Sequence, residues 1–170
     1  MKTTSAYANK MIKQLLEEKE YWLEQERNSS IYTVSVGETP VVPEYDYQTI
    51  SQTIAEIDNK IITIKHAINL SNTTSVIDIE GENLTIDTVL VKMAQKNNRK
   101  RILDFMRKQL PKKRITDGFY ARNAAPEYQY INYDLEKVKA DYEKIDLEIM
   151  QLQIALDKHN QTHEFEIEFH

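Results

Sequence analysis

Six isoleucines between residues 46 and 71 recur at alternating spacings of four and three residues. This spacing places them on one stripe of an α-helix, because an a/d seam repeats every 3.5 residues. A β-strand would need a period of two, which the polar residues between them do not supply. Burying such a side chain contributes about 1.5–3 kcal/mol, more than the roughly 0.5 kcal/mol that isoleucine costs a helix. The stripe consists of Ile50, Ile54, Ile57, Ile61, Ile64 and Ile68.

Glycine and proline residues divide the chain into long uninterrupted stretches. They gather at residues 37–43, at Gly81 and from Pro111 to Pro126, and are almost missing between these places. Since both residues interrupt helices, the pattern predicts four long helices at about 5–28, 46–71, 86–110 and 134–162. No linker of a different composition separates them, so we expect a single domain over residues 1–170.

The helix predicted at 134–162 carries apolar residues on two faces. One stripe runs from Leu135 to Leu156 at spacings of three and four, and a second lies on roughly the opposite face. A helix that is apolar on two faces must be covered on two sides. This helix is therefore either central in the bundle or shared with another subunit. The residues expected in the core or in an interface are Ile54, Ile57, Ile61, Ile64, Leu147, Ile149, Met150, Leu152 and Ile154.

Four short segments have the composition of β-strands. Ile31–Val36, within the Gly/Pro loop 29–45, is rich in β-branched residues, and Val76–Ile79 opens a hairpin-like connection at 72–85. Residues 127–133 end an otherwise irregular connection at 111–133, and the C-terminal segment 163–170 alternates acidic and apolar side chains. The predicted fold is mainly α: a bundle of about four long amphipathic helices in coiled-coil-like hairpins, with a small antiparallel β component.

The composition excludes several classes of function. The chain has no cysteine, which rules out disulfides, thiolate catalysis and Cys-based metal centres. Its three glycines are too far apart for a P-loop or a dinucleotide-binding fingerprint. No apolar run approaches the roughly 20 residues of a membrane span, and the first residues lack the apolar stretch of a signal peptide. We therefore expect a cytoplasmic protein without a transmembrane segment or a cofactor.

One segment is strongly basic. Residues 92–114 contain ten Lys or Arg and a single acid, Asp104, a net charge of +9 within a chain of net charge −5. Such a segment attracts phosphates, so one interpretation is a nucleic-acid or polyanion binder with Lys96, Arg99, Lys100 and Arg101 as the anion-binding residues. The other interpretation is a solvated face whose charges meet acidic residues of the first and last helices. No aromatic residues for base stacking are interleaved with the central cations, which favours the second interpretation.

Two histidines near the end of the last predicted helix stand four residues apart. His159 and His163 could present two imidazoles on one face for zinc, nickel or copper. No third ligand is evident, and His159 also continues the apolar seam, which favours a packing role. Motifs for a catalytic serine or a di-metal carboxylate site do not occur.

The tyrosines also cluster. They gather at Tyr32, Tyr45 and Tyr47, and at Tyr120, Tyr128, Tyr130 and Tyr133. Aromatic residues are enriched where surfaces meet partners, but they also cover the ends of bundles. Both interpretations stay open.

Three stretches resemble a family of small bacterial proteins labelled septicolysin-like. The first is Arg27-Asn28 followed by Gly37-Glu38-Thr39-Pro40 and Pro43. The second is Ile68-Asn69-Leu70-Ser71-Asn72 followed by Gly81-Glu82-Asn83-Leu84-Thr85, and the third is Leu156-Asp157, Gln161 and Glu164-Phe165. The resemblance implies a helical, self-associating protein, and its label adds a membrane-active, cytolysin-like alternative.

The leading hypothesis is a non-enzymatic structural or interaction module that forms a homo-oligomer through its helical seams. Long rods in a 170-residue chain expose much surface for their volume, and pairing with a second copy reduces it. The alternatives are nucleic-acid or polyanion binding through residues 92–114 and the cytolysin-like activity.

Overall fold

The computed structural model describes residues 1–115 and 127–169 and is mainly helical. Its four helices are α1 (Ser5–Ser29), α2 (Tyr47–Thr74), α3 (Ile86–Arg107) and α4 (Leu135–Thr162), which confirms the four predicted helices. Three antiparallel strand pairs within the described residues supply the small β component. The chain divides into two compact units, Met1–Ser75 with Asp157–His170, and Val76–Leu156, which are described in turn. That the chain forms a single domain stays a prediction.

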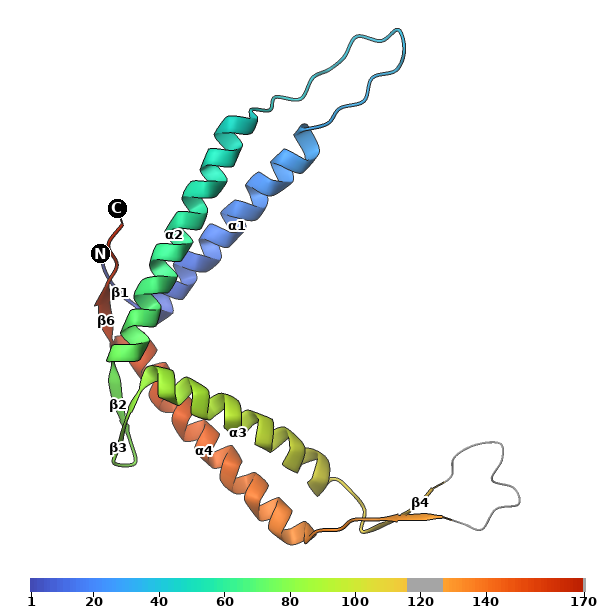
Figure 1. Ribbon diagram of the computed structural model, residues 1–170, viewed down its shortest axis with the longest axis vertical. Helices are drawn as coiled ribbons and strands as arrows, with labels where there is room; N and C mark the ends of the chain where they lie inside the picture. Colours follow the sequence, from blue (N-terminus) through green and yellow to red (C-terminus); the bar gives the residue numbers. More distant parts are fainter. Residues whose placement is uncertain (116–126, 170) are drawn as a thin grey trace. The chain divides into compact units, whose positions relative to one another are not determined.

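The first unit is built on the hairpin of α1 and α2, which lie side by side in Figure 1. Thr4 caps α1 by accepting a hydrogen bond from the Tyr7 N–H, and Asp46 caps α2 through the Gln48 N–H. The predicted isoleucine stripe of α2 faces α1 and supplies half of the buried core residues. Its buried members are Ile57, Ile61 and Ile64, together with Ala8 and Ile12 of α1 and Ile167. Trp22 and Phe165 pack against this core from its edge.

Two strands close the base of this unit. β1 (Lys2–Thr4) pairs with β6 (Glu164–Glu166), and Ile167 exchanges two backbone hydrogen bonds with Met1, of 2.7 and 2.8 Å. Within the strand predicted at 163–170, β6 covers three residues, with Phe165 half-buried between exposed glutamates; Ile167, just after it, is fully buried, and Phe169 is exposed. His170 lies outside the described residues. β1 was not predicted, because three polar residues carry no strand pattern of their own.

The strand predicted at Ile31–Val36 is wrong. This segment is irregular and leads into a turn in which the Glu38 N–H donates to the Ser35 carbonyl and Gly37 takes a φ of +90°. Ile31 and Val36 are almost fully exposed. β-branched residues favour strands only where neighbouring strands and a core pack against them, and this loop meets neither.

The second unit contains α3, most of α4 and a β-hairpin. β2 (Val76–Ile79) pairs with β3 (Glu82–Thr85), which confirms the hairpin-like connection at 72–85. Glu80 and Gly81 both have positive φ, as a two-residue hairpin turn requires. Thr85 then caps α3 by accepting from the Thr88 N–H. The core of this unit consists of Leu84, Val89 and Leu152, with Ile77, Ile79 and Met93 packed against it.

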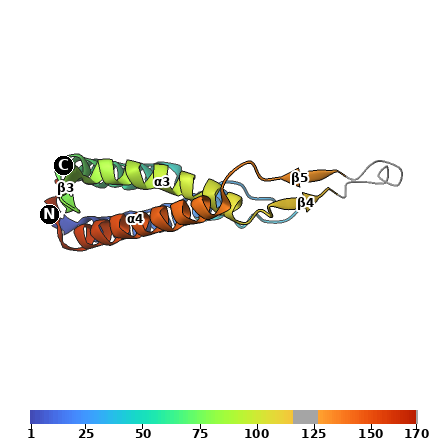
Figure 2. The same cartoon turned by 90° about the horizontal axis from the view of Figure 1, so that it is seen from below.

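A second β-ribbon extends beyond the ends of α3 and α4 (Figure 2). β4 (Lys112–Arg114) pairs with β5 (Tyr128–Tyr130), which lies within the strand predicted at 127–133, whereas β4 falls in the part of the connection predicted to be irregular. Helix α3 stops at Arg107, three residues before its predicted end, because Pro111 and the strand follow. Residues 116–126 of the connection, Tyr120 among them, lie outside the described residues.

Candidate functional site

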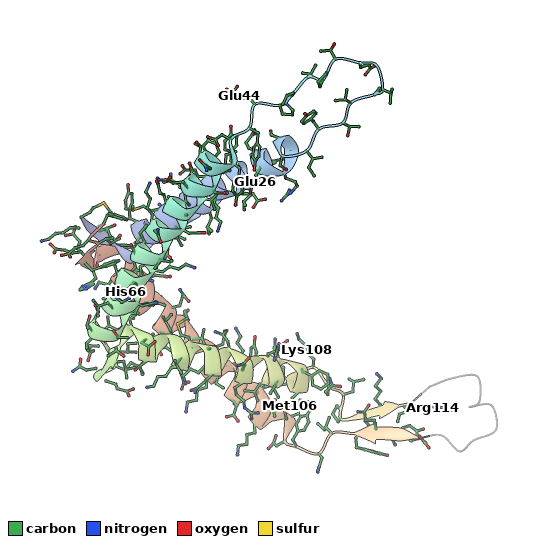
Figure 3. The ribbon with its side chains drawn as sticks, turned by 45° about the horizontal axis from the view of Figure 1, so that its top comes forward. Glu26, Glu44, His66, Met106, Lys108 and Arg114 are labelled. Carbon is green, nitrogen blue, oxygen red and sulfur yellow. The ribbon has the colours of Figure 1, made fainter. Side chains whose placement is uncertain are left out.

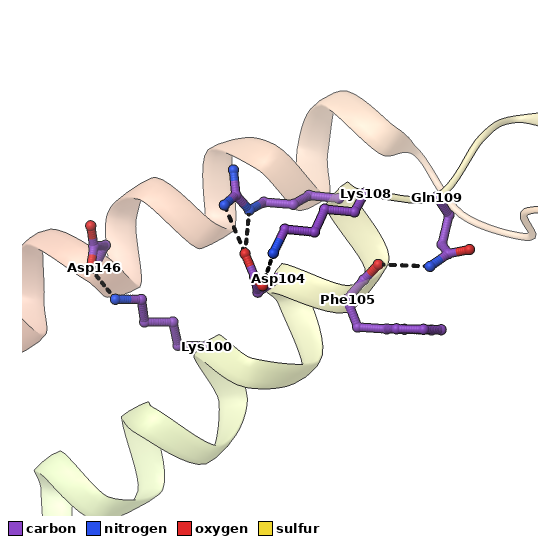
Figure 4. A network of polar contacts seen from close by, with 7 residues as sticks. Lys100, Asp104, Phe105, Lys108, Gln109 and Asp146 are labelled. Atoms are coloured by element: carbon purple, nitrogen blue, oxygen red, sulfur yellow. Dashed lines mark hydrogen bonds and ion pairs between the residues drawn. The ribbon is translucent and has the colours of Figure 1, made fainter.

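Two cations of α3, Lys96 and Lys100, are paired with carboxylates of α4. Lys96 Nζ lies 2.5 Å from Glu148 Oε2, and both side chains are about one-third exposed. Lys100 forms an ion pair with Asp146, about half a turn before Glu148 on α4 (Figure 4). The bond from Lys96 lowers the pKa of Glu148, and the bond to Asp146 raises the pKa of Lys100. Two of the four predicted anion-binding residues thus already hold carboxylates.

The C-terminal cations of α3 are paired within their own helix. Asp104 accepts from Arg107 at 2.7 Å and also from Lys108, which Figure 4 labels beside it. These two bonds lower the pKa of Asp104, that from Lys108 most. The Arg107 guanidinium also lies 4.0 Å from the centre of the Tyr142 ring on α4. Asp104, the single acid of the basic segment, is therefore already paired with two cations of that segment.

The two other predicted anion-binding residues do not complete a cationic site. Arg99 lines a shallow groove of about 280 Å³ between α3 and α4, whereas Arg101 is exposed. The groove contains both signs of charge, so its field partly cancels. Its lining residues are Lys96, Arg99, Leu103, Asp141, Lys144, Ile145 and Glu148.

The two histidines stack on each other. The ring centroids of His159 and His163 lie 4.5 Å apart with the planes inclined by 18°. His163 Nε2 lies 3.0 Å from the Ser75 hydroxyl, whereas Nε2 of the buried His159 has no hydrogen-bond partner in the described part of the chain. Burial, and next the neighbouring imidazole of His163, lowers the pKa of His159. In the part of the chain that the structure describes, no group of three or more His, Asp or Glu side chains is placed to hold a metal ion.

Ser75 and His163 are close enough to form a nucleophile and its base, but their setting opposes acyl transfer. Ser75 caps the C-terminus of α2, where the helix dipole is negative and disfavours a developing oxyanion. The Ser75 hydroxyl also meets that of Ser71, at 3.4 Å. The arrangement acts as a polar clasp that joins the end of α2 to the segment after α4.

This clasp lies at one wall of an open cleft of about 650 Å³ in the first unit. The cleft lies between α2 and the segment that contains β6, and it combines imidazoles, hydroxyls and carboxylates with an apolar floor. No sequence signal pointed to it, because its walls come from segments far apart in the chain. It is lined in part by Ile62, His66, Leu70, Ser71, Ser75, His163, Phe165, Glu166 and Glu168.

The second apolar stripe of α4 is exposed to solvent. Leu147, Met150 and Ile154 have 53, 51 and 61% of their surface accessible. On the opposite face, Val138, Leu152 and Leu156 are buried, and Ile149 is half-buried. On α2, Ile54 is half-buried. One of the two expectations for α4 was a central position in the bundle. That position would bury these three side chains, but they are exposed.

The β4–β5 ribbon brings together residues that sequence inspection did not connect. Lys112 lies opposite Tyr130, and Arg114 opposite Tyr128. Lys112 Nζ lies 4.2 Å from the centre of the Tyr128 ring and 5.4 Å from that of Tyr130. The only usable signal was the tyrosine alternation at 128–130, since Lys-Lys-Arg does not resemble a strand.

The other tyrosines occupy different settings. Tyr133 donates to the Met106 carbonyl at 2.8 Å and so ties β5 to the end of α3. Tyr45 donates to Glu26 at 3.1 Å, and its pKa is raised, mainly by burial and next by this bond. Tyr32 and Tyr47 are exposed.

No protein-family model and no curated protein sequence matches this chain. The fold is similar to a crystal structure from Corynebacterium diphtheriae, that of a functionally unknown conserved protein, with a TM-score of 0.70 and 15% sequence identity. The match covers 98% of this chain and 100% of the other. At this level of identity the similarity shows the mainly helical fold alone.

None of the helices in the described ranges combines the length and the apolar character that crossing a bilayer demands.

Proposed function

We propose that this protein is a non-enzymatic interaction module whose chains associate with each other through α4. The observation that carries the proposal is the exposed stripe of Leu147, Met150 and Ile154, on a helix whose other face is already buried. Three large apolar side chains in one line on a rigid helix are typical of an interface core.

The order of residues along α4 makes the stripe complementary to itself. At helical spacing, Glu143 stands one turn before Leu147, and Lys158 one turn after Ile154. If two copies of α4 pack antiparallel about a point next to Met150, Leu147 of each copy meets Ile154 of the other. The same alignment sets each Glu143 against a Lys158. Opposite charges then flank an apolar centre, as expected for a two-fold interface.

The amount of exposed surface also favours association. The 20.0 kDa chain exposes 13080 Å². Two compact domains of half its mass would together expose about 10,500 Å². The excess is available for burial against a second copy, for which a stable interface needs about 800 Å² from each partner.

Light scattering coupled to size-exclusion chromatography tests the proposal. At micromolar concentration we expect a mass of about 40 kDa, twice the chain mass of 20.0 kDa. The double variant Met150→Glu/Ile154→Glu should elute as a monomer, because two carboxylates would be buried against a copy of themselves.

The matched control replaces two exposed apolar residues elsewhere, Leu16→Glu and Val36→Glu. This variant should keep the wild-type mass. A monomeric wild type, or a dimer that survives the α4 substitutions, contradicts the proposal.

Polyanion binding by the basic face of α3 and a cytolysin-like activity stay predictions. The ion pairs of Lys96 and Lys100 count against the first, and the second rests on the septicolysin-like resemblance.

A further inference from the structure

The β4–β5 ribbon presents a face made only of cations and tyrosines. Directly opposed residues of an antiparallel pair share a face, and side chains two apart along a strand point the same way. The register therefore places Lys112, Arg114, Tyr128 and Tyr130 together on one side. The opposite side carries Lys113 and Gln129; together with Tyr130, the segment after it and the end of α3, these two residues line a groove of about 230 Å³.

This face is accessible and well anchored. All six strand residues are exposed, with 42% of the surface of Tyr128 and 62% of that of Tyr130 accessible. The ribbon is extended by backbone bonds from Ile115 to Glu127 and from Ile131 to Pro111. Figure 3 shows Arg114 on this ribbon, past Met106 and Lys108 at the end of α3. The side chains are thus held on a hydrogen-bonded backbone that extends beyond the ends of α3 and α4 (Figure 2).

The ribbon carries a net positive charge, whereas the whole chain carries a net negative charge. Residues 112–115 and 127–131 contain three cations and one acid, Glu127, a net charge of +2 in a chain of net charge −5. Charges separated by more than about 10 Å are largely screened at moderate salt, so the local positive field governs what approaches the ribbon.

We propose that the face formed by Lys112, Arg114, Tyr128 and Tyr130 binds single-stranded nucleic acid. The two tyrosines stand two residues apart on one strand, about 7 Å, and offer flat surfaces for two unstacked bases. Lys112 lies by both rings and Arg114 lies beside Tyr128 on the same face, in reach of the phosphates that join those bases. A cation–π contact at an exposed site is weak, so Lys112 can exchange a ring for a phosphate.

Duplex DNA and membranes fit this face less well. In a duplex the faces of the bases are stacked on each other and cannot receive a tyrosine ring. A membrane anchor needs aliphatic side chains that enter the acyl region, and this face has none. The proposal is independent of self-association, because the residues of the α4 stripe take no part in it.

Fluorescence anisotropy with labelled 12-residue oligo(dT) and oligo(rU) tests the proposal. Two contacted phosphates give a slope of about −1.4 in log K against log salt, so affinity should fall about 7-fold between 50 and 200 mM salt. Lys112→Gln/Arg114→Gln should flatten this slope. Tyr128→Leu/Tyr130→Leu should weaken binding at least about 10-fold while keeping the slope, since stacking is not a charge effect. The DNA and RNA arms distinguish the source of the strand.

Two matched variants of the first unit serve as controls and should bind as the wild type does. They are Lys10→Gln/Lys65→Gln, which removes the same charge, and Tyr32→Leu/Tyr47→Leu, which removes two exposed rings. Circular dichroism establishes that every variant is folded. No binding at 50 mM salt, unchanged affinity of the tyrosine variant, tighter binding to a duplex of equal length, or preference for vesicles with anionic lipid would each overturn the proposal.

Discussion

The imidazole of His159 is packed face to face against that of His163, with 4.5 Å between the ring centroids. The His163 ring lies in hydrogen-bond distance of the Ser75 hydroxyl, whereas Nε2 of His159 has no partner among the described residues. A proton on His159 would therefore sit next to another imidazole and in a buried position.

This arrangement predicts that the first unit loses stability in mild acid. Because burial lowers the pKa of His159 in the folded state, the unfolded chain, with an ordinary value near 6.5, takes up the proton first as the pH falls. The stability contributed by neutral His159 is present above about pH 6.5 and is lost below it. We expect the melting temperature to fall between pH 7.5 and 5.5, and to fall less in His159→Phe. His66→Phe, at an exposed position of α2, is the control and should follow the wild type; an equal pH response in His159→Phe would refute the assignment.

The isoleucine stripe of α2 predicts a sharp contrast between neighbours. Ile64 is fully buried and Ile62 is 63% exposed, two residues apart on one helix. Ile64→Ala should lower the free energy of unfolding by about 2–5 kcal/mol through lost burial and a residual cavity. Ile62→Ala should change it by less than about 0.5 kcal/mol. Urea unfolding measures both, and similar costs would mean that the core lies elsewhere.

The pair between Lys96 and Glu148 should couple only weakly. Both side chains are about one-third exposed, so water screens their attraction. A double-mutant cycle with Lys96→Met and Glu148→Gln should give a coupling of about 0.3–1 kcal/mol that decreases in 1 M salt. A coupling that is insensitive to salt would show that the two residues act through packing instead.

The β2–β3 turn should not tolerate a side chain at Gly81. Its φ is +86° and nothing lies within 4 Å of the added Cβ, so Gly81→Ala tests backbone strain alone. We expect a loss of about 1 kcal/mol in the free energy of unfolding. Gly37→Ala, at φ +90° in the irregular loop 30–46, should cost less, because that loop can rearrange without disturbing a strand pair. Equal losses would argue against this difference.

The helices could be predicted because their signal is local and repeated. The six isoleucines of α2 specify both the helix and its buried face, and Gly81 specifies the hairpin turn. The pairing of Lys2–Thr4 with Glu164–Glu166 could not be predicted, since it joins ends of the chain that share no local pattern. For Ile31–Val36 the reverse holds: the composition favours a strand, but no strand of the described residues pairs with this segment.

The candidate sites also separate into those that depend on a local pattern, which could be predicted, and those that depend on long-range pairing, which could not. The two faces of α4 could be inferred from spacing, so the exposed stripe was expected to need a cover. The ribbon face could not, because Lys112 and Tyr130 meet only through strand pairing across a long connection. The basic segment 92–114 was predicted as one stretch, but its sequence does not show that Lys112 and Arg114 lie beyond α3, on a strand beside tyrosines.

The place of Trp22 gives this chain a built-in optical reporter. It is the single tryptophan, and it packs at the edge of the core of α1 and α2, with Tyr21 edge-on at 5.3 Å. Its emission therefore follows the melting of that hairpin alone, whereas the far-ultraviolet signal sums all four helices. Comparing the two readouts in one titration tells whether the chain unfolds in one cooperative step or in two.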